Sequence, residues 1–103
     1  MLQLILTQQA QNSLDEIVSF LYDEPFPARA EKVVQSIDKA LERVTQFPQS
    51  FSVCFDIEPA QQNIRQIIVH NTFKIIYRIS NKQIEVLEIF HGSRNPEHLK
   101  NLI

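Results

Sequence analysis

Glycine is almost absent from this chain, and its scarcity excludes a large class of binding sites. The only glycine among 103 residues is Gly92, whereas the loops that bind nucleotide phosphates need several glycines at fixed spacing. The sequence also lacks an H-E-x-x-H zinc motif and a G-x-S-x-G nucleophile elbow. His91 and His98 alone make a poor metal site, so we expect neither a metal ion nor a cofactor.

Two further absences bear on where the protein works. Cys54 is the only cysteine, which excludes an intrachain disulfide and a multi-cysteine metal site. The N-terminal apolar run Leu4–Leu6 is short and has no basic flank, so it does not resemble a signal peptide. No apolar run approaches the roughly 18 residues of a membrane span. We therefore expect a cytoplasmic protein with no membrane partner.

Charge is low overall but unevenly distributed. The formal net charge is −2, yet residues 1–63 carry four Lys/Arg against nine Asp/Glu, and residues 64–103 carry six against three. The net basic C-terminal part is where an anionic partner could bind. Acidic helices followed by strands that end in lysine would give the same asymmetry without any partner.

The N-terminal half predicts a strand followed by two amphipathic helices. Leu2–Leu6 has the pattern of a short strand, and the hydroxyl of Thr7 can cap a helix over Gln8–Tyr22. Pro25 ends that helix, and a second helix is expected from about Pro27 to Phe47, with its proline in the first turn. Two helices joined so closely form an antiparallel hairpin, whose apolar stripe would cover a sheet.

Residues 63–94 predict that sheet, with the sequence NIRQIIVHNTFKIIYRISNKQIEVLEIFHGSR. Three runs rich in Ile, Val, Phe and Tyr alternate with two polar turns, which indicates an antiparallel meander. Two-residue loops at His70-Asn71 and Asn81-Lys82 would fix the register and sort the side chains onto two faces. The face expected under the helices holds Ile64, Gln66, Ile68, Phe73, Ile75, Tyr77, Ile79, Ile84, Val86, Glu88 and Phe90. The other face holds Arg65, Ile67, Val69, Lys74, Ile76, Arg78, Glu85, Leu87 and Ile89.

The second face of this meander is a candidate partner-binding surface. It would expose an apolar strip beside cations, and exposed strips of this kind typically mark interaction sites. Arg78 would lie opposite Glu85 on neighbouring strands. The residues expected to bind a partner are Arg65, Ile67, Lys74, Ile76, Arg78, Leu87 and Ile89.

The remaining segments complete one α+β domain over residues 1–103. Phe51–Phe55 alternates apolar and small residues, as a short strand or an irregular extension would. The polar residues 56–63 predict a loop. Asn95 and Pro96 predict a short C-terminal helical turn.

The cations and imidazoles of the C-terminal part allow one kind of catalysis. They are Arg65, Lys74, Arg78, Lys82, His91 and Arg94. Cleavage of RNA through the 2′-hydroxyl needs a base, an acid and a cation for the phosphate. His91 could supply the base or the acid, and Arg65 or Arg94 the cation. The structural alternative is that Arg78 pairs with Glu85 and that Arg94 binds carbonyls near the chain end.

The order strand, long helical hairpin, meander and short tail resembles the toxins of the RelE/ParE superfamily. The matching pieces are Arg65 at the start of the first meander strand, FKIIYRI at Phe73–Ile79 and VLEIFHGSR at Val86–Arg94. The resemblance covers essentially the whole chain. It implies the toxin of a bacterial type II toxin–antitoxin pair, with a role in plasmid stabilization and a small cognate antitoxin as partner.

Two branches of this superfamily imply different targets. RelE-like toxins are basic and cut mRNA in the ribosomal A site, with arginines at positions resembling Arg65 and Arg94 and a Tyr or His near the C-terminus. ParE-like toxins have the longer helical hairpin and inhibit DNA gyrase without cutting RNA. The resemblance to the ribonuclease branch implies Arg65, His91 and Arg94 as catalytic residues.

The sequence departs from the ribonuclease branch and favours the ParE-like one. Its net charge is slightly negative, no tyrosine follows Arg94, and the segment DIEPAQQN before Arg65 has two acids and no lysine. A negatively charged protein is repelled by RNA phosphates, which disfavours its binding in a site that they line. We therefore expect a gyrase inhibitor that is not an enzyme. The alternatives are a ribosome-dependent mRNA endoribonuclease and a non-toxic binding module, and a homodimer is left open.

Overall fold

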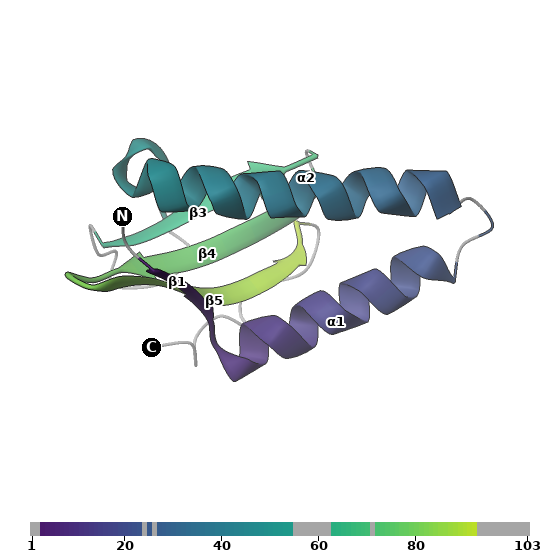
Figure 1. Cartoon of the computed structure of the whole chain (residues 1–103), viewed down its shortest axis with the longest axis horizontal. Helices are drawn as coiled ribbons and strands as arrows, with labels where there is room; N and C mark the ends of the chain where they lie inside the picture. Colours follow the sequence, from purple (N-terminus) through teal and green to yellow (C-terminus); the bar gives the residue numbers. More distant parts are fainter. Residues whose placement is uncertain (1–2, 24, 26, 55–62, 71, 93–103) are drawn as a thin grey trace.

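Two helices lie against one face of a mixed sheet, in an α+β arrangement (Figure 1). The computed structural model describes residues 3–23, 25, 27–54, 63–70 and 72–92. The elements in chain order are β1 (Gln3–Leu6), α1 (Gln8–Tyr22), α2 (Pro27–Gln46), the 3-10 turn η1 (Pro48–Ser50), β2 (Ser52–Val53), β3 (Ile64–Val69), β4 (Phe73–Ile79) and β5 (Gln83–His91). The strand order is β1-β5-β4-β3-β2.

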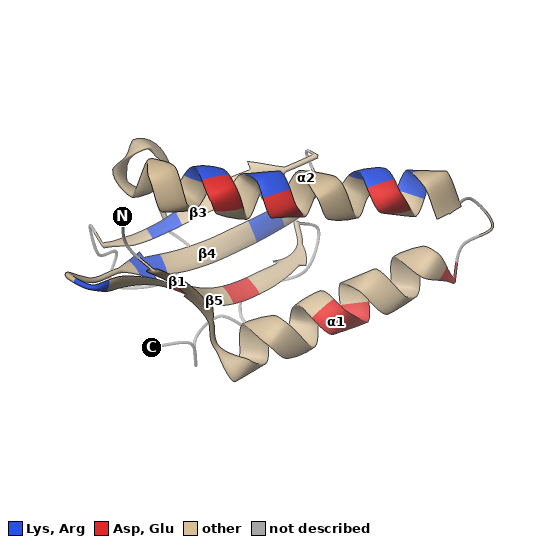
Figure 2. Ribbon diagram, in the orientation of Figure 1, with Lys and Arg blue, Asp and Glu red and all other residues tan. Residues whose placement is uncertain are grey.

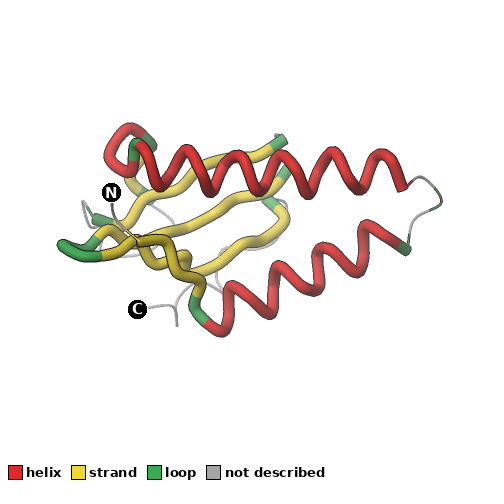
Figure 3. The backbone as a smooth tube through the Cα atoms, viewed as in Figure 1, coloured by secondary structure: helices red, strands yellow, loops and turns green. Residues whose placement is uncertain are grey.

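The helical hairpin forms where the sequence predicts it. The Thr7 hydroxyl accepts a hydrogen bond from the Ala10 N–H at 3.2 Å, which caps α1 as expected. Pro27 is the first residue of α2, where a missing N–H costs nothing. The two helices approach each other toward the end of α1 and the start of α2, which extend beyond the sheet (Figure 3).

The meander β3-β4-β5 is antiparallel, as predicted. β1 instead pairs in parallel with β5, with Leu4 beside Ile84 and Leu6 beside Val86. A parallel neighbour needs a long crossover connection, and here the helical hairpin and the first meander strands supply it. β2 covers only the start of β3 at the opposite edge, where Ser52 pairs with Gln66.

The predicted register of the first hairpin is wrong by one residue. Val69 pairs with Phe73, so the connection has three residues rather than two, and His70 adopts a positive φ of 58°. A shift of one residue turns every side chain of a strand to the opposite face. Ile67 and Val69 therefore lie under the helices, while Ile64, Gln66 and Ile68 lie on the other face.

The second hairpin has the predicted turn but contains a bulge. Ser80 N–H donates to the Gln83 carbonyl at 2.9 Å, and Ile79 pairs with Ile84 as expected. Further along, Tyr77 pairs with Val86 and the preceding β4 residue pairs with Glu88, so β5 carries one extra residue. After this bulge the faces are exchanged relative to the prediction, and Ile89 faces the helices while Phe90 does not.

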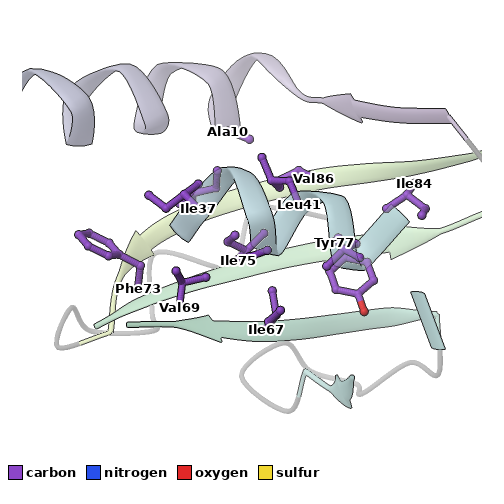
Figure 4. Packing of buried hydrophobic residues seen from close by; sticks show 13 residues of the cluster. Ala10, Ile37, Leu41, Ile67, Val69, Phe73, Ile75, Tyr77, Ile84 and Val86 are labelled. Carbon is purple, nitrogen blue, oxygen red and sulfur yellow. The ribbon is translucent and has the colours of Figure 1, made fainter. Parts of the chain in front are cut away.

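The main hydrophobic core lies between the helices and the sheet (Figure 4). Leu14 and Ile17 of α1 and Ile37 and Leu41 of α2 pack with the sheet residues, which confirms the predicted cover. Burial of such side chains stabilises a fold by about 1.5–3 kcal/mol each. The sheet residues in this cluster are Ile67, Val69, Phe73, Ile75, Tyr77, Ile84, Val86 and Ile89.

A second buried cluster lies on the other face of the sheet. It consists of Cys54, Ile64, Ile76, Leu87 and Phe90. Cys54 is fully buried, as expected of a small hydrophobic side chain. Among the described residues, no helix combines the length and the apolar character needed to cross a membrane. The predicted C-terminal turn and most of the predicted loop at 56–63 lie outside the described residues.

Candidate functional site

Arg65, a predicted catalytic and partner-binding residue, holds the segment after α2 against the sheet. Its Nη1 donates to the carbonyl of Gln49 at 2.9 Å and to that of Phe51 at 2.8 Å. The sequence predicted carbonyl contacts for Arg94 instead, which lies outside the described residues. Two charge-assisted bonds fix this guanidinium beside η1 and β2.

Tyr77, which neighbours Arg65 across β3 and β4, reinforces the same attachment. Its hydroxyl donates to the Pro48 carbonyl at 2.6 Å, and its side chain is fully buried. Burial raises the pKa of Tyr77 to about 12, although the positive charge of Arg65 opposes part of this shift. The hydroxyl therefore stays protonated at neutral pH and acts as a donor.

His91, the predicted acid or base, lies at the other end of the sheet. It is the last residue of β5 and pairs with Phe73, whereas Arg65 pairs with Tyr77. Four residues of β4 separate these positions, which is about 13 Å at roughly 3.3 Å per residue. The structure therefore does not bring Arg65 and His91 together around one phosphate. His91 instead lies edge-on against Phe73, with ring centroids 5.6 Å apart.

The second face holds an ion pair where the sequence predicts it. Arg78 lies opposite Glu85, and its Nε and Nη2 donate to Glu85 Oε1 at 3.1 and 2.9 Å. Lys74, another predicted partner-binding residue, lies on the same face opposite Phe90. The alternative in which Arg78 pairs with Glu85 is confirmed.

The predicted exposure of the apolar strip is wrong. Ile67 is 8% exposed, Ile76 0%, Leu87 2% and Ile89 1%. Ile67 and Ile89 face the helices because of the three-residue connection and the bulge. Ile76 and Leu87 belong to the second buried cluster. A contact between this strip and a partner stays a prediction, and it would require that cluster to open.

An open groove lies instead between the free end of the helical hairpin and the β3–β4 connection. A hollow of about 410 Å³ is lined by residues of α1, α2 and the strand ends. A second hollow of about 280 Å³ adjoins it and shares Phe20, Phe73 and His91. We call these two hollows together the hairpin groove. The aromatic, cationic and imidazole side chains that line the groove are those of Phe20, Arg29, Lys32, His70, Phe73 and His91.

Sequence reasoning missed most of this groove. Phe20 lies off the apolar stripe of α1, and this position in the sequence is the signal that could have indicated an exposed aromatic residue. In the structure Phe20 is 68% exposed. Arg29 and Lys32 resemble ordinary solvated charges on an amphipathic helix. Their proximity to His70 could not be read from a chain in which about forty residues separate them.

Another hollow, of about 320 Å³, lies near β2 and is lined by Arg43, Ser52 and Gln66 among others. Gln66 Oε1 is buried there without a hydrogen-bond partner. No group of three His, Cys, Asp or Glu that could hold a metal ion occurs in the described part of the chain. Charge is distributed by element (Figure 2): α1 carries only acidic charged residues, while α2 carries both signs. The hairpin groove therefore has an acidic wall and a more basic one.

Comparison with known proteins identifies relatives for the whole fold. A family described as the ParE toxin of type II toxin–antitoxin system, parDE, matches residues 4–96. Among solved structures, the chromosomal ParDE toxin–antitoxin system from P. aeruginosa contains a chain that is 23% identical, with a TM-score of 0.69. That match covers 88% of this chain and 96% of the other, and it shows a shared fold. A comparison with curated proteins found no match.

Proposed function

The chain belongs to the ParE toxins of type II toxin–antitoxin systems, and we propose that it inhibits DNA gyrase and that a cognate antitoxin neutralises it. The family match across residues 4–96 is the observation that carries this proposal. The long hairpin of α1 and α2, which distinguishes ParE-like toxins from the ribonuclease branch, agrees with it.

Two of the three predicted catalytic residues, Arg65 and His91, do not share one phosphate site. The guanidinium of Arg65 donates hydrogen bonds to two backbone carbonyls. His91 lies about 13 Å further along the sheet. A phosphate at either residue would be out of reach of the other, because general acid–base catalysis needs contacts of about 3 Å. Arg94, the other cation predicted to act with His91, lies outside the described residues, and the endoribonuclease is kept as the alternative that the test below distinguishes.

The test separates the two toxin activities in one preparation. The protein is produced with its neighbouring small open reading frame, separated from it, and added to purified gyrase and relaxed plasmid. We expect loss of supercoiling that is restored when the neighbouring protein is returned. Expression of the toxin alone in cells should produce filaments and a DNA-damage response.

A matched translation assay provides the control. Programmed ribosomes are incubated with the same toxin preparation, and mRNA ends are mapped at nucleotide resolution. Intact mRNA together with inhibited supercoiling supports the proposal. Codon-positioned cuts that disappear in His91→Ala would overturn it in favour of the ribonuclease. Activity in neither assay would identify a non-toxic member of the family.

A further inference from the structure

The outer edge of β3 is paired along only part of its length. β2 pairs with β3 at Gln66 and Arg65, and no strand in the described ranges lies on this side of Ile68. The Cys54 N–H donates to the Ile64 carbonyl at 2.9 Å. Because backbone groups of alternate residues point to the same side of a strand, those of Ile64, Gln66 and Ile68 all point toward the line of β2. The N–H and carbonyl of Ile68 therefore face the open edge.

A hollow of about 320 Å³ lies at this open position. Its lining includes Ser52, Gln66 and Ile68, so it begins where β2 ends, and we call it the edge hollow. The Ile68 side chain is 55% exposed, and Gln66 Oε1 is buried without a hydrogen-bond partner. A buried acceptor without a donor costs free energy. An occupant would gain by offering an N–H to Gln66 and apolar surface to Ile68.

A cation lies at the α2 side of the edge hollow. Arg43 lines it and is exposed, and its guanidinium carbon lies 5.8 Å from the centroid of the Phe51 ring. None of the described lining residues is acidic. The forked donors of an arginine bind a carboxylate well. The charge at this position therefore favours an occupant with a carboxylate.

β2 limits the length of any strand that is added here. An antiparallel strand beside Ile68 would run toward β2, and the next backbone-pairing position is at Gln66, about 7 Å away at roughly 3.3 Å per residue. Ser52 already occupies that position, so the added strand has to end or turn away inside the edge hollow. A chain that ends there would place its terminal carboxylate in the hollow that Arg43 lines.

A second copy of this chain does not fit the same edge. Two β3 strands related by a two-fold axis at Ile68 would place His70 of one copy opposite Gln66 of the other, where Ser52 lies. His70 also has φ 58°, so the backbone leaves the extended conformation there. A short peptide with a free end avoids both conflicts.

We propose that the outer edge of β3 binds an extended C-terminal peptide of a partner protein. One residue of the peptide pairs with the backbone of Ile68, an N–H donates to Gln66 Oε1, and the terminal carboxylate binds Arg43. The residue beside Ile68 carries an apolar side chain, because cross-strand neighbours contact each other. Strand addition to a sheet edge and capture of a terminal carboxylate are both recurrent modes of peptide recognition. This binding goes beyond gyrase inhibition and does not depend on it.

A peptide titration tests the proposal on the full-length chain. The probe is a short N-acetylated peptide of alternating threonine and valine that ends in a free valine carboxylate. A defined sequence suffices, because main-chain hydrogen bonds supply the affinity in strand addition. With nitrogen-15-labelled protein, we expect the Ile68 amide resonance to shift as the peptide is added. The same peptide with an amidated C-terminus should bind about five-fold more weakly, because a neutral amide loses the charge-assisted bonds.

Three variants locate the two ends of the peptide. Arg43→Gln should weaken the carboxylate peptide about five-fold and leave the amidated one unchanged, as expected when the two groups contact each other. Arg29→Gln neutralises another exposed arginine of α2, one that does not line the edge hollow, and should bind like the unaltered protein. Ile68→Pro removes the outward N–H and should abolish binding of both peptides. Proline is tolerated where the N–H of an edge strand faces outward, so this variant should keep its fold.

The outcomes decide between the proposal and its alternatives. No shift at Ile68 up to millimolar peptide would overturn strand addition at this edge. Equal binding of the carboxylate and amide forms, or equal losses in Arg43→Gln and Arg29→Gln, would overturn the capture of a chain end. Arg43 is exposed, so its variant decides the matter even where Ile68→Pro unfolds. None of these results bears on supercoiling by gyrase, so the proposed function is tested separately.

Discussion

The hydroxyl of Tyr77 attaches the segment after α2 to the sheet, and its removal measures how much this bond contributes to the free energy of unfolding. It donates to the Pro48 carbonyl at 2.6 Å from a fully buried ring. Tyr77→Phe keeps the ring packing and removes the donor. A hydrogen bond contributes about 0.5–1.5 kcal/mol net, and a buried acceptor left unpaired costs about 1–3 kcal/mol. Because Pro48 is only half-buried, water can partly replace the donor, and we expect a loss of about 1 kcal/mol.

The same hydroxyl should make stability depend on pH in the alkaline range. Its pKa is raised from 10.0 to about 12 in the folded chain, chiefly by burial. Below pH 10 the hydroxyl is protonated in both states. Between about pH 10 and 12 the unfolded chain loses this proton while the folded chain keeps it, so stability falls as pH rises. Two pKa units correspond to about 2.7 kcal/mol.

Urea unfolding at neutral and alkaline pH measures both effects. At neutral pH, Tyr77→Phe should lower the free energy of unfolding by about 1 kcal/mol, or the Tm by roughly 4–8 °C. Between pH 10 and 12, the unaltered protein should lose about 2–3 kcal/mol more than Tyr77→Phe. Every other titratable group is present in both proteins, so the difference isolates the phenol.

A spectroscopic titration checks the pKa itself. The chain has two tyrosines, so Tyr22→Phe leaves Tyr77 as the only phenol whose ionisation changes the ultraviolet absorbance. We expect its midpoint near pH 12 in the folded protein, or coincident with unfolding. A midpoint near pH 10 with the fold intact would refute both the burial of this hydroxyl and its role as a fixed donor.

Three further substitutions test the packing. Ile76→Glu should cost more than about 4 kcal/mol and prevent folding, because the position is 0% exposed; a folded variant by circular dichroism would contradict the burial of the second cluster. Arg78→Ala should cost less than about 1 kcal/mol in urea unfolding, since both partners of its ion pair are partly exposed. Gly92→Ala should cost about 1–2 kcal/mol, because its Cβ would lie 3.0 Å from the Thr72 carbonyl oxygen; an unchanged Tm would show that this backbone can move aside.

The helices and the strand order of the meander were predictable because local chemistry determines them. The Thr7 hydroxyl accepts from the Ala10 N–H three residues later, so this cap is set by the local sequence. Pro25 and Pro27 restrict the backbone between the helices wherever the hairpin packs. The register of β3 was not predictable in this way. A two-residue and a three-residue connection through His70 differ little in sequence, yet they place opposite faces of the strand under the helices.

The bulge in β5 could not be predicted from the sequence, for a related reason. Val86–Phe90 reads Val-Leu-Glu-Ile-Phe, a run that is apolar on both sides of one acid, so alternation gives no sign of where a residue is inserted. Glu88 is 2% exposed, and its two carboxylate oxygens accept from Gln9 Nε2 and from the Ile89 N–H. The long-range partner on α1 satisfies this buried carboxylate, and no local pattern could supply that information.

The two ends of the sheet have different consequences for binding. Near Arg65 and Tyr77, side-chain donors bond to the carbonyls of η1 and its neighbours, so these carbonyls are satisfied within the fold. At the other end, a histidine in the left-handed region and an exposed phenylalanine remain beside a hollow. A binding segment gains most where it buries exposed apolar surface without breaking existing hydrogen bonds. The exposed Phe20 at the hairpin groove meets that condition, whereas a segment bound at Arg65 would compete with its hydrogen bonds to Gln49 and Phe51.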